Sequence, residues 1–239
     1  MLITWKCHRP KLIFYFLLSI FCSVSLLCSC ALGPKKEVQK TPQEMYNEGL
    51  KLLNKKKYER AAEAFQKLKE EHPLSSYTPL AELRIADALF FNKSYAEAVN
   101  QYEEFRKLHP LHPEVPYAIY QIGMCYFKQM LSVDRDQTAT EKALEQFRYL
   151  IENFPQSPHT PAAREKVQAC RRQLAEHEYY IAHFYFRMKK YRAALGRFEK
   201  ILQTFPDLGY EEKLKPLIAK CQAEIAKIEE KEKKKEKGG

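Results

Sequence analysis

The sequence predicts an all-α fold built from repeated antiparallel helix pairs, and two observations lead to it. The 239 residues include only 7 glycines, and 29% of the residues are charged. Few glycines together with many alanine, leucine, glutamate and lysine residues favour helix over sheet. In addition, four segments end alike, in the letters EEHP, KLHP, ENFP and QTFP. Because proline ends a helix, this recurring proline marks the end of a recurring helix.

The same pattern precedes each of these four prolines. A small residue, a large residue, an alanine, an aromatic residue and an apolar residue recur in order, as in Gly49, Leu52, Ala61, Phe65 and Leu68 before Pro73. In three units the small residue precedes the alanine by 12 residues; in the third unit the gap is 20, which indicates eight inserted residues near LSVDRDQT. This is the tetratricopeptide (TPR) pattern, in which the small residue and the alanine let paired helices approach closely and the aromatic fills the gap between repeats. We therefore expect a TPR-like right-handed α-solenoid.

The individual elements follow from this register. We expect helix pairs over residues 42–54 with 57–71, 78–92 with 94–108, 115–130 with 138–153, and 176–189 with 191–204. Prolines stand at helix starts, where a missing N–H is harmless. A further helix over about 160–175 can run continuously into the fourth pair, and a last helix spans about 210–230. These elements form a superhelical domain over 42–225. Residues 226–239 form a charged tail, and we expect it to be frayed and solvated.

The N-terminus has the features of a secretory signal over residues 1–29. Three basic residues precede an uncharged, mostly apolar run from Leu12 to Leu27. Sixteen residues are too few for a membrane-spanning helix, which needs about 20, but they suit the apolar core of a signal peptide. An uncleaved N-terminal anchor remains the alternative. Residues 30–41 are then a flexible, lipidated linker to the helical domain.

The segment Leu27-Cys28-Ser29-Cys30 resembles the bacterial lipobox, with leucine three positions before the modified cysteine and a small residue just before it. The resemblance implies that Cys30 carries an N-acyl diacylglycerol and becomes the first residue of the mature chain. Two or three acyl chains, such as palmitate, anchor a domain stably, since each buried methylene contributes about 0.8 kcal/mol. Ala31 in place of an aspartate points to the outer membrane. We expect no other cofactor, and a location on the periplasmic side.

Longer stretches narrow the family. The segments HPLSSYTPLAELRIADALFFNKSYAEAVNQYEEFRKLHPLHPEVPYAIYQIG and LAEHEYYIAHFYFRMKKYRAALGRFEKILQTFPD resemble the BamD (ComL-type) family of outer-membrane assembly lipoproteins over roughly residues 30 to 225. The resemblance implies a non-enzymatic scaffold of the β-barrel assembly complex that binds unfolded outer-membrane protein precursors. It also implies docking to the POTRA domain of the barrel-forming subunit, and contacts with accessory lipoproteins. The short third-repeat insertion and the absence of a complete fifth pair depart from the family pattern. Another TPR lipoprotein adaptor, such as a pilus-secretin pilotin, remains the alternative.

In the TPR register, fixed positions of the first helix of each pair point into the concave groove. The sequence places mainly aromatic and apolar residues there: Tyr46, Leu50, Leu53, Leu83, Asp87, Phe90, Phe91, Tyr120, Met124 and Phe127. Such a groove would suit a peptide with aromatic anchors. The resemblance implies the same target, because barrel precursors carry an aromatic-rich C-terminal signal. The alternative is that these side chains only pack the first helices together.

The fourth unit is more basic, and the resemblance implies partner docking there through Arg187 and Arg197. The alternative for Arg197 is an ordinary solvated helix charge.

The formal net charge is +10, of which three charges precede residue 30, leaving +7. A domain of this charge could touch anionic lipid, but no basic and aromatic cluster supports nucleic-acid binding. No catalytic motif or metal-ligand spacing is present, so an enzyme is not expected. Cys125, Cys170 and Cys221 are expected to be buried thiols, with a disulfide as the alternative.

Overall fold

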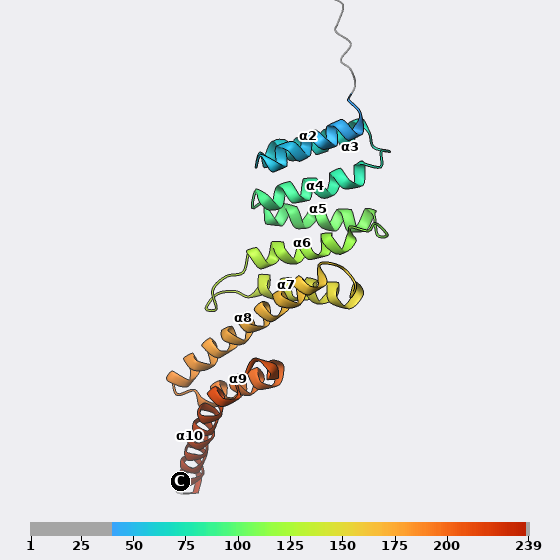
Figure 1. Cartoon of the computed structure of the whole chain (residues 1–239). Coiled ribbons are helices and arrows are strands. Elements are labelled where there is room, and N and C mark those ends of the chain that lie inside the picture. The colour runs from blue at the N-terminus through green and yellow to red at the C-terminus, as the bar shows by residue number, and fades with distance from the viewer. Residues whose placement is uncertain (1–39, 238–239) are drawn as a thin grey trace, which may run out of the picture. The chain divides into compact units, whose positions relative to one another are not determined.

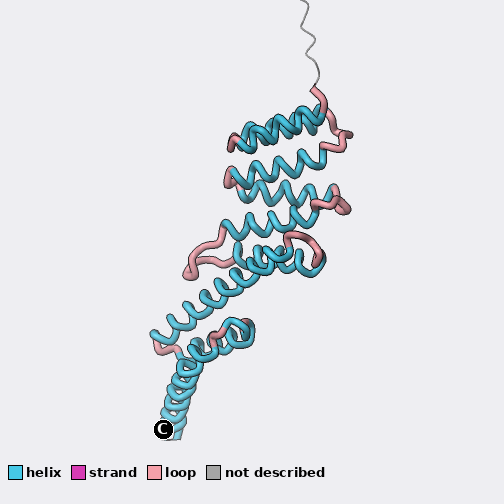
Figure 2. Tube along the Cα trace, viewed as in Figure 1, coloured by secondary structure: helices cyan, strands magenta, loops and turns pink. Residues whose placement is uncertain are grey.

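The computed structural model describes residues 40–237, and within that range it contains helices and no strand (Figures 1 and 2). The elements are α2 (Pro42–Asn54), α3 (Tyr58–Glu71), α4 (Thr78–Phe91), α5 (Tyr95–Leu108), α6 (Val115–Lys128), α7 (Thr138–Asn153), α8 (Thr160–Arg187), α9 (Tyr191–Thr204), the short 3-10 helix η2 (Pro206–Leu208) and α10 (Glu211–Lys237). The expected signal sequence and Cys30 lie outside the described residues. The all-α solenoid of helix pairs is confirmed, and the paired helices begin and end within two residues of the expected positions, apart from the start of α8.

Each helix packs against its neighbours in the chain, from α2 on α3 to α9 on α10. The short turns that join the two helices of a pair lie along one edge of the stack in Figure 2, and the connections between pairs lie along the other. The first helices of the pairs, α2, α4, α6 and α8, therefore run in similar directions. This arrangement makes equivalent positions of successive pairs neighbours in space.

Local signals in the sequence set where the helices begin and end. A capping box opens α2: the Glu44 backbone N–H donates to Thr41 Oγ1 at 3.3 Å, and the Thr41 N–H donates to Glu44 Oε2 at 2.8 Å. The connections between pairs repeat one hydrogen bond. The Thr78 hydroxyl donates to the His72 carbonyl at 2.7 Å, and the Thr160 hydroxyl donates to the Phe154 carbonyl at 2.7 Å. The shared pattern Pro-x-Ser-x-x-Thr thus fixes the same connection twice.

The small residues of the repeat lie directly beneath the aromatic residues of the same pair. A Cβ atom added to Gly49 would lie 2.5 Å from Cε1 of Phe65, and one added to Gly123 would lie 2.6 Å from Cε1 of Phe147. Phe65 also belongs to one buried cluster with Ala81 and Ile85 of the next pair. The aromatic side chain therefore does more than the expected filling between repeats, because it also fills the space above the glycine of its own pair.

The helix α8 joins two expected segments into one helix of 28 residues. No glycine or proline interrupts the sequence around residue 175, and Ala175 is fully buried within the helix. The helix packs against α7 before it and α9 after it. The first half of α8 therefore packs into the buried cluster of α4 to α7, through Ala163 and Cys170. Its second half forms the fourth pair with α9.

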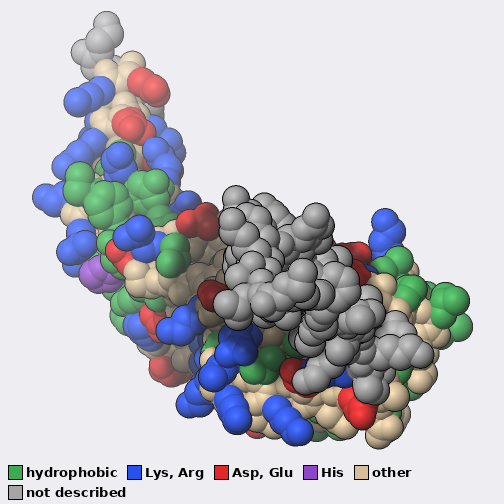
Figure 3. Space-filling view, turned by 90° about the horizontal axis from the view of Figure 1, so that it is seen from above, with side chains coloured by type: hydrophobic (Ala, Val, Ile, Leu, Met, Phe, Trp, Pro, Cys, Tyr) green, Lys and Arg blue, Asp and Glu red, His purple; other side chains and the backbone are tan. Residues whose placement is uncertain are grey.

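The charged tail differs from expectation, because α10 continues as helix through residue 237. Ion pairs between residues three or four apart support this helix, as between Lys227 and Glu224 at 2.8 Å and Lys234 and Glu230 at 2.6 Å. Arg192 of α9 reaches Glu229 at 3.0 Å. The side chains are nevertheless exposed, and the arm at the upper left of Figure 3 carries mixed basic and acidic groups.

The expectation of buried thiols is confirmed. Cys125, Cys170 and Cys221 are free and buried. Burial raises the pKa of Cys125 and of Cys170 from 9.0 to about 12, with the Asp87 carboxylate adding to the effect at Cys125. Among the described helices, none has the length and apolar character that crossing a bilayer requires.

Candidate functional site

Side chains of the first helices contact one another from pair to pair, and we call this surface the inner-helix face. Arg84 Nε of α4 donates to the Tyr46 hydroxyl of α2 at 3.3 Å. The Tyr117 hydroxyl of α6 donates to Asp87 Oδ1 of α4 at 2.8 Å. Lys166 Nζ of α8 lies 4.7 Å from the centre of the Phe127 ring of α6. The face thus extends continuously over the first helices of all four pairs.

A buried carboxylate stands at the centre of this face. Asp87 is 2% exposed, and its Oδ1 accepts hydrogen bonds from Tyr102 at 2.6 Å and from Tyr117 at 2.8 Å. Its Oδ2 forms an ion pair with Arg84 of the same helix. Gln121 in turn donates to the Tyr117 hydroxyl at 2.9 Å. One carboxylate therefore connects α4 with both α5 and α6, and through Arg84 with α2.

The charges of this network support one another. Burial acts to lower the pKa of Arg84, but the Asp87 carboxylate and the Tyr46 hydroxyl together outweigh burial and hold the pKa above its ordinary value. Burial is the main cause that raises the pKa of Tyr102 and of Tyr117 above 10.0, and the Asp87 carboxylate is the second. The two tyrosines therefore stay protonated hydrogen-bond donors, as an acceptor with only lone pairs requires.

Two of the residues expected to meet a client peptide are not available to it. Leu83 is fully buried in the core, and Asp87 is buried with its oxygens already bonded to Arg84, Tyr102 and Tyr117. The correction has a physical cause. The helix α4 packs between neighbouring helices, and eight of its 14 residues are buried. For these two positions the alternative, packing of the first helices, is right.

The other expected client residues keep exposed surface. Phe91 is 47% exposed, and it stacks on Tyr58 at 5.7 Å between ring centres and contacts Phe90 at 5.6 Å. Tyr120 stacks on His159 at 5.5 Å. The remaining members are half-buried: Tyr46, Leu50, Leu53, Phe90, Tyr120, Met124 and Phe127. The face therefore presents partly exposed aromatic rings around a buried polar network.

Sequence reasoning missed three residues of that network, Arg84, Tyr102 and Tyr117. One signal could have found the first. Arg84 and Asp87 are opposite charges three residues apart in the mostly apolar segment TPLAELRIADALFF, and this spacing lets them pair on one face of the helix. The tyrosines carry no comparable signal, because their partner lies 15 and 30 residues away.

The two residues expected to dock a partner differ in environment. Arg187 lies exposed in the last turn of α8 and forms no ion pair with the described residues. Arg197 of α9 is 36% exposed, and its Nη1 lies 2.6 Å from Glu178 Oε2 of α8. Lys200 Nζ lies 2.6 Å from the other oxygen of Glu178. Burial acts to raise the pKa of Glu178, but these two cations outweigh it and lower the pKa. One carboxylate facing two cations leaves this patch with a net positive charge.

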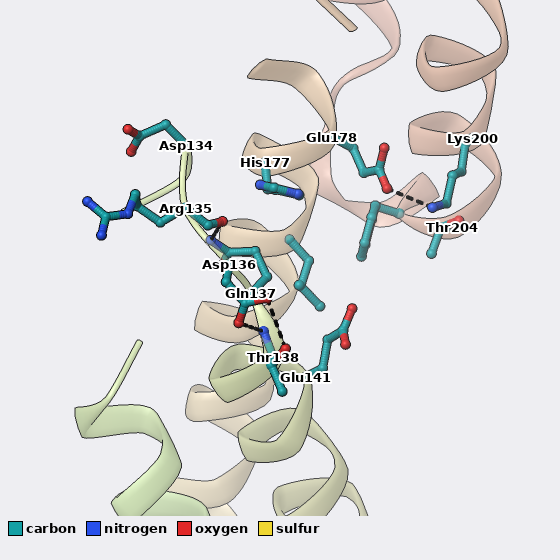
Figure 4. Close-up of a pocket in the computed structure, with 12 residues that line it drawn as sticks. Asp134, Arg135, Asp136, Gln137, Thr138, Glu141, His177, Glu178, Lys200 and Thr204 are labelled. Atoms are coloured by element: carbon teal, nitrogen blue, oxygen red, sulfur yellow. Dashed lines mark hydrogen bonds and ion pairs between the residues drawn. The ribbon is translucent and has the colours of Figure 1, made fainter. Parts of the chain in front are cut away.

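A hollow of about 560 Å³ adjoins this patch (Figure 4). The inserted loop forms one wall, and in Figure 4 Asp134 and Arg135 point away from the α8 and α9 side chains. Two hydrogen bonds hold the loop on α8: Gln173 Nε2 to the Leu131 carbonyl at 2.7 Å, and His177 Nδ1 to the Val133 carbonyl at 2.6 Å. The insertion is therefore a fixed part of the surface near Arg197.

Comparison with known proteins identifies the family. The model of the YfiO family, described as outer membrane lipoprotein, matches residues 38–237. The chain is 36% identical over 161 residues to the outer membrane protein assembly factor BamD of Rickettsia prowazekii, covering 67% of this chain and 64% of the relative. It is 30% identical over 181 residues to BamD of Caulobacter vibrioides, covering 74% and 59%. The matches thus span about three fifths of the length of these two relatives.

Among solved structures, the TPR2AB domain of yeast Sti1, in its complex with pHSP90, aligns with a TM-score of 0.49 and 14% identity over 77% of this chain and 70% of that one. The family assignment rests on the sequence matches. The family match covers nearly all the described residues, and the resemblance to BamD expected from the sequence is confirmed. The chain belongs to the YfiO family of outer membrane lipoproteins.

Proposed function

We propose that this chain is a non-enzymatic scaffold lipoprotein of the complex that assembles β-barrel proteins in the outer membrane. The observation that carries the proposal is its membership of a family whose named relatives are outer membrane protein assembly factors. Its two working surfaces are the inner-helix face and the basic patch around Arg197. Cys30 carries the lipid that tethers the chain to the periplasmic side of the membrane.

The inner-helix face binds the aromatic-rich end of an unfolded barrel precursor. Phe91, Tyr120 and Phe127 supply ring surface from two successive first helices, and aromatic anchors contribute most of the binding energy in such contacts. The buried Asp87 network keeps these helices in register without contacting the client. A pre-arranged face loses less entropy when a flexible peptide binds.

The C-terminal half docks the POTRA domain of the barrel-forming subunit. Arg187 has no internal ion-pair partner among the described residues, and Arg197 shares Glu178 with Lys200, so both can meet an acidic surface. Surfaces of complementary charge raise the association rate and fix the orientation of the partners. Accessory lipoproteins are further candidate partners of the same assembly.

Affinity purification of the full-length lipoprotein from detergent-solubilised outer membrane tests the proposal. Mass spectrometry of the co-purified proteins should find the barrel-forming subunit, and mass spectrometry of the mature N-terminal peptide should find acylated Cys30. A Phe91→Ser, Tyr120→Ser variant should lose cross-linking to a barrel-precursor peptide while it keeps the barrel-forming subunit. Recovery of a secretin in place of the barrel-forming subunit would instead identify a pilus adaptor.

A further inference from the structure

Three turns that join the helices of a pair place a lysine in the left-handed backbone conformation. Lys56, Lys93 and Lys189 have φ values of 58°, 66° and 58°. Each follows the residue that caps the first helix of its pair, and the backbone hydrogen bonds of the three turns are the same. The N–H of the lysine donates three residues back, and the next N–H donates five residues back. This is the Schellman ending, in which that position is usually glycine.

A lysine is less favourable than glycine at this backbone position. Glycine adopts positive φ freely, whereas a side chain with a Cβ atom is strained there. Strain repeated at equivalent positions points to a use for the side chain rather than for the turn. All three side chains are exposed, and no described residue forms an ion pair with them. Each lysine therefore presents a full positive charge to whatever lies beyond the turn.

The turns lie on one edge of the stack, and the first three follow one another directly. One hollow of about 430 Å³ is lined by residues 56–60 and by Asn92 of the next turn. An equivalent hollow of about 280 Å³ is lined by residues 93–97 and by Gln129 of the turn after that. Figure 2 shows the fourth turn, between α8 and α9, on the same side of the stack.

Basic residues outnumber acidic ones along this edge. We call it the lysine edge, and in and beside the first three turns it carries Lys55, Lys56, Lys57, Arg60, Lys93, Lys128 and Arg135, against Glu59, Glu97, Asp134 and Asp136. The fourth turn adds Lys189 and Lys190. Lysine is a compact charge on a flexible stem, so it can follow mobile phosphates without a fixed geometry, whereas arginine binds a carboxylate or phosphate in one planar arrangement.

We propose that the lysine edge lies against the anionic phospholipid headgroups of the membrane that holds the chain. The proposal rests on the lipid anchor proposed above. The helix α2 begins 12 residues after Cys30, and a fully extended chain of that length spans at most about 43 Å, at 3.3–3.6 Å per residue. Basic residues near an anionic leaflet attract it strongly, and an acyl chain combined with a basic patch binds more firmly than either alone.

Lysine footprinting on reconstituted vesicles tests this assignment. The full-length lipoprotein is anchored in vesicles of phosphatidylcholine alone or with about one third phosphatidylglycerol, and lysine acetylation rates are measured by mass spectrometry. We expect Lys56, Lys93 and Lys189 to react roughly three- to tenfold more slowly on the anionic vesicles, with the difference lost in 0.5 M salt, where the Debye length is only about 4 Å. Lys107 and Lys215, which are exposed on other parts of the stack, are the internal controls.

A Lys56→Gly, Lys93→Gly variant separates binding from folding. Its melting temperature should equal or exceed that of the wild type, because glycine relieves the strained turns, while the protection of Lys57 and Lys189 should fall. Three outcomes would each overturn the proposal: equal reaction rates on both vesicles, equal protection of Lys107 and Lys215, or protection that appears only when the barrel-forming subunit is added. The last outcome would indicate an acidic protein partner. Flotation with the vesicles reports the anchor separately. Protein that does not float with phosphatidylcholine vesicles carries no working anchor, and its co-sedimentation with the anionic vesicles would still support the lysine edge.

Discussion

The Tyr117 hydroxyl donates a 2.8 Å hydrogen bond to Asp87 Oδ1, and this bond joins the first helices of the second and third pairs. The same oxygen accepts from Tyr102 at 2.6 Å, and the other oxygen pairs with Arg84. A solenoid holds each pair only through its neighbours, so a group that connects three pairs opposes their separation. We infer that this buried carboxylate makes the N-terminal pairs unfold together.

The substitution Asp87→Asn tests that inference. It leaves the Arg84 guanidinium without its anionic partner and places an amide among hydroxyl donors, so we expect the free energy of unfolding to fall by about 3–5 kcal/mol. Tyr117→Phe removes a single hydrogen bond and should cost only about 1 kcal/mol. Urea unfolding followed by circular dichroism measures both. An Asp87→Asn loss no larger than that of Tyr117→Phe would mean that the network is not cooperative.

Glycine substitutions test the close packing of the helix pairs. A methyl group on Gly49 would meet the Phe65 ring at 2.5 Å, and the buried ring has no open space to move into, so Gly49→Ala should destabilise the protein by about 1–3 kcal/mol. Gly196→Ala is the matched control, because nothing lies within 4 Å of its added Cβ atom. It should stabilise α9 by up to about 1 kcal/mol through helix propensity. Thermal unfolding should show opposite shifts, and shifts of the same sign would refute the packing argument.

The repeat made most of this fold predictable from sequence, since the spacing of Gly49, Ala61 and Phe65 encodes contacts within a single pair. The same local signals placed α2 and α7 at the expected residues. The extension of α10 was not predictable from an apolar stripe, because ion pairs such as Lys234 with Glu230 support it instead.

The candidate site was less accessible to sequence reasoning for a related reason. The register placed Leu83 and Asp87 on the inner surface, but burial depends on how closely the neighbouring helices approach. That distance is set by residues far away in the chain, such as Tyr102 and Tyr117. Register predicts the direction of a side chain, and only the packed structure gives its exposure.

Variants at Arg197 and Glu178 separate partner docking from internal pairing. Arg197→Gln removes the charge without creating repulsion, and it should weaken association with the barrel-forming subunit about tenfold, which corresponds to 1.4 kcal/mol. Glu178→Gln releases Arg197 from its 2.6 Å contact and should leave association unchanged or strengthen it. Both can be measured by titration of the purified subunits. If the two variants weaken association equally, Arg197 acts only through its pair with Glu178.

The buried thiols should make the protein sensitive to alkali. The pKa of Cys125 and of Cys170 is raised from 9.0 to about 12 in the folded chain, so their contribution to stability is complete below pH 9 and is lost as pH rises towards 12. In the unfolded chain each thiol ionises near its ordinary pKa, so each lowers the free energy of unfolding by about 1.4 kcal/mol per pH unit above pH 9. We therefore expect a loss of about 3 kcal/mol between pH 8 and pH 10.

A Cys125→Ala, Cys170→Ala variant should flatten this decline, although the lost sulfur atoms lower its stability at neutral pH. The raised pKa of Tyr102 and of Tyr117 adds a further loss above pH 10, which the variant should keep. Urea unfolding at half-unit steps from pH 8 to pH 11 measures both effects. Burial also raises the pKa of Cys221, which lies in a separate cluster, so Cys221→Ala should remove a further part of the alkaline loss. A double variant that loses stability as steeply as the wild type below pH 10 would show that the two thiols are not the groups that titrate.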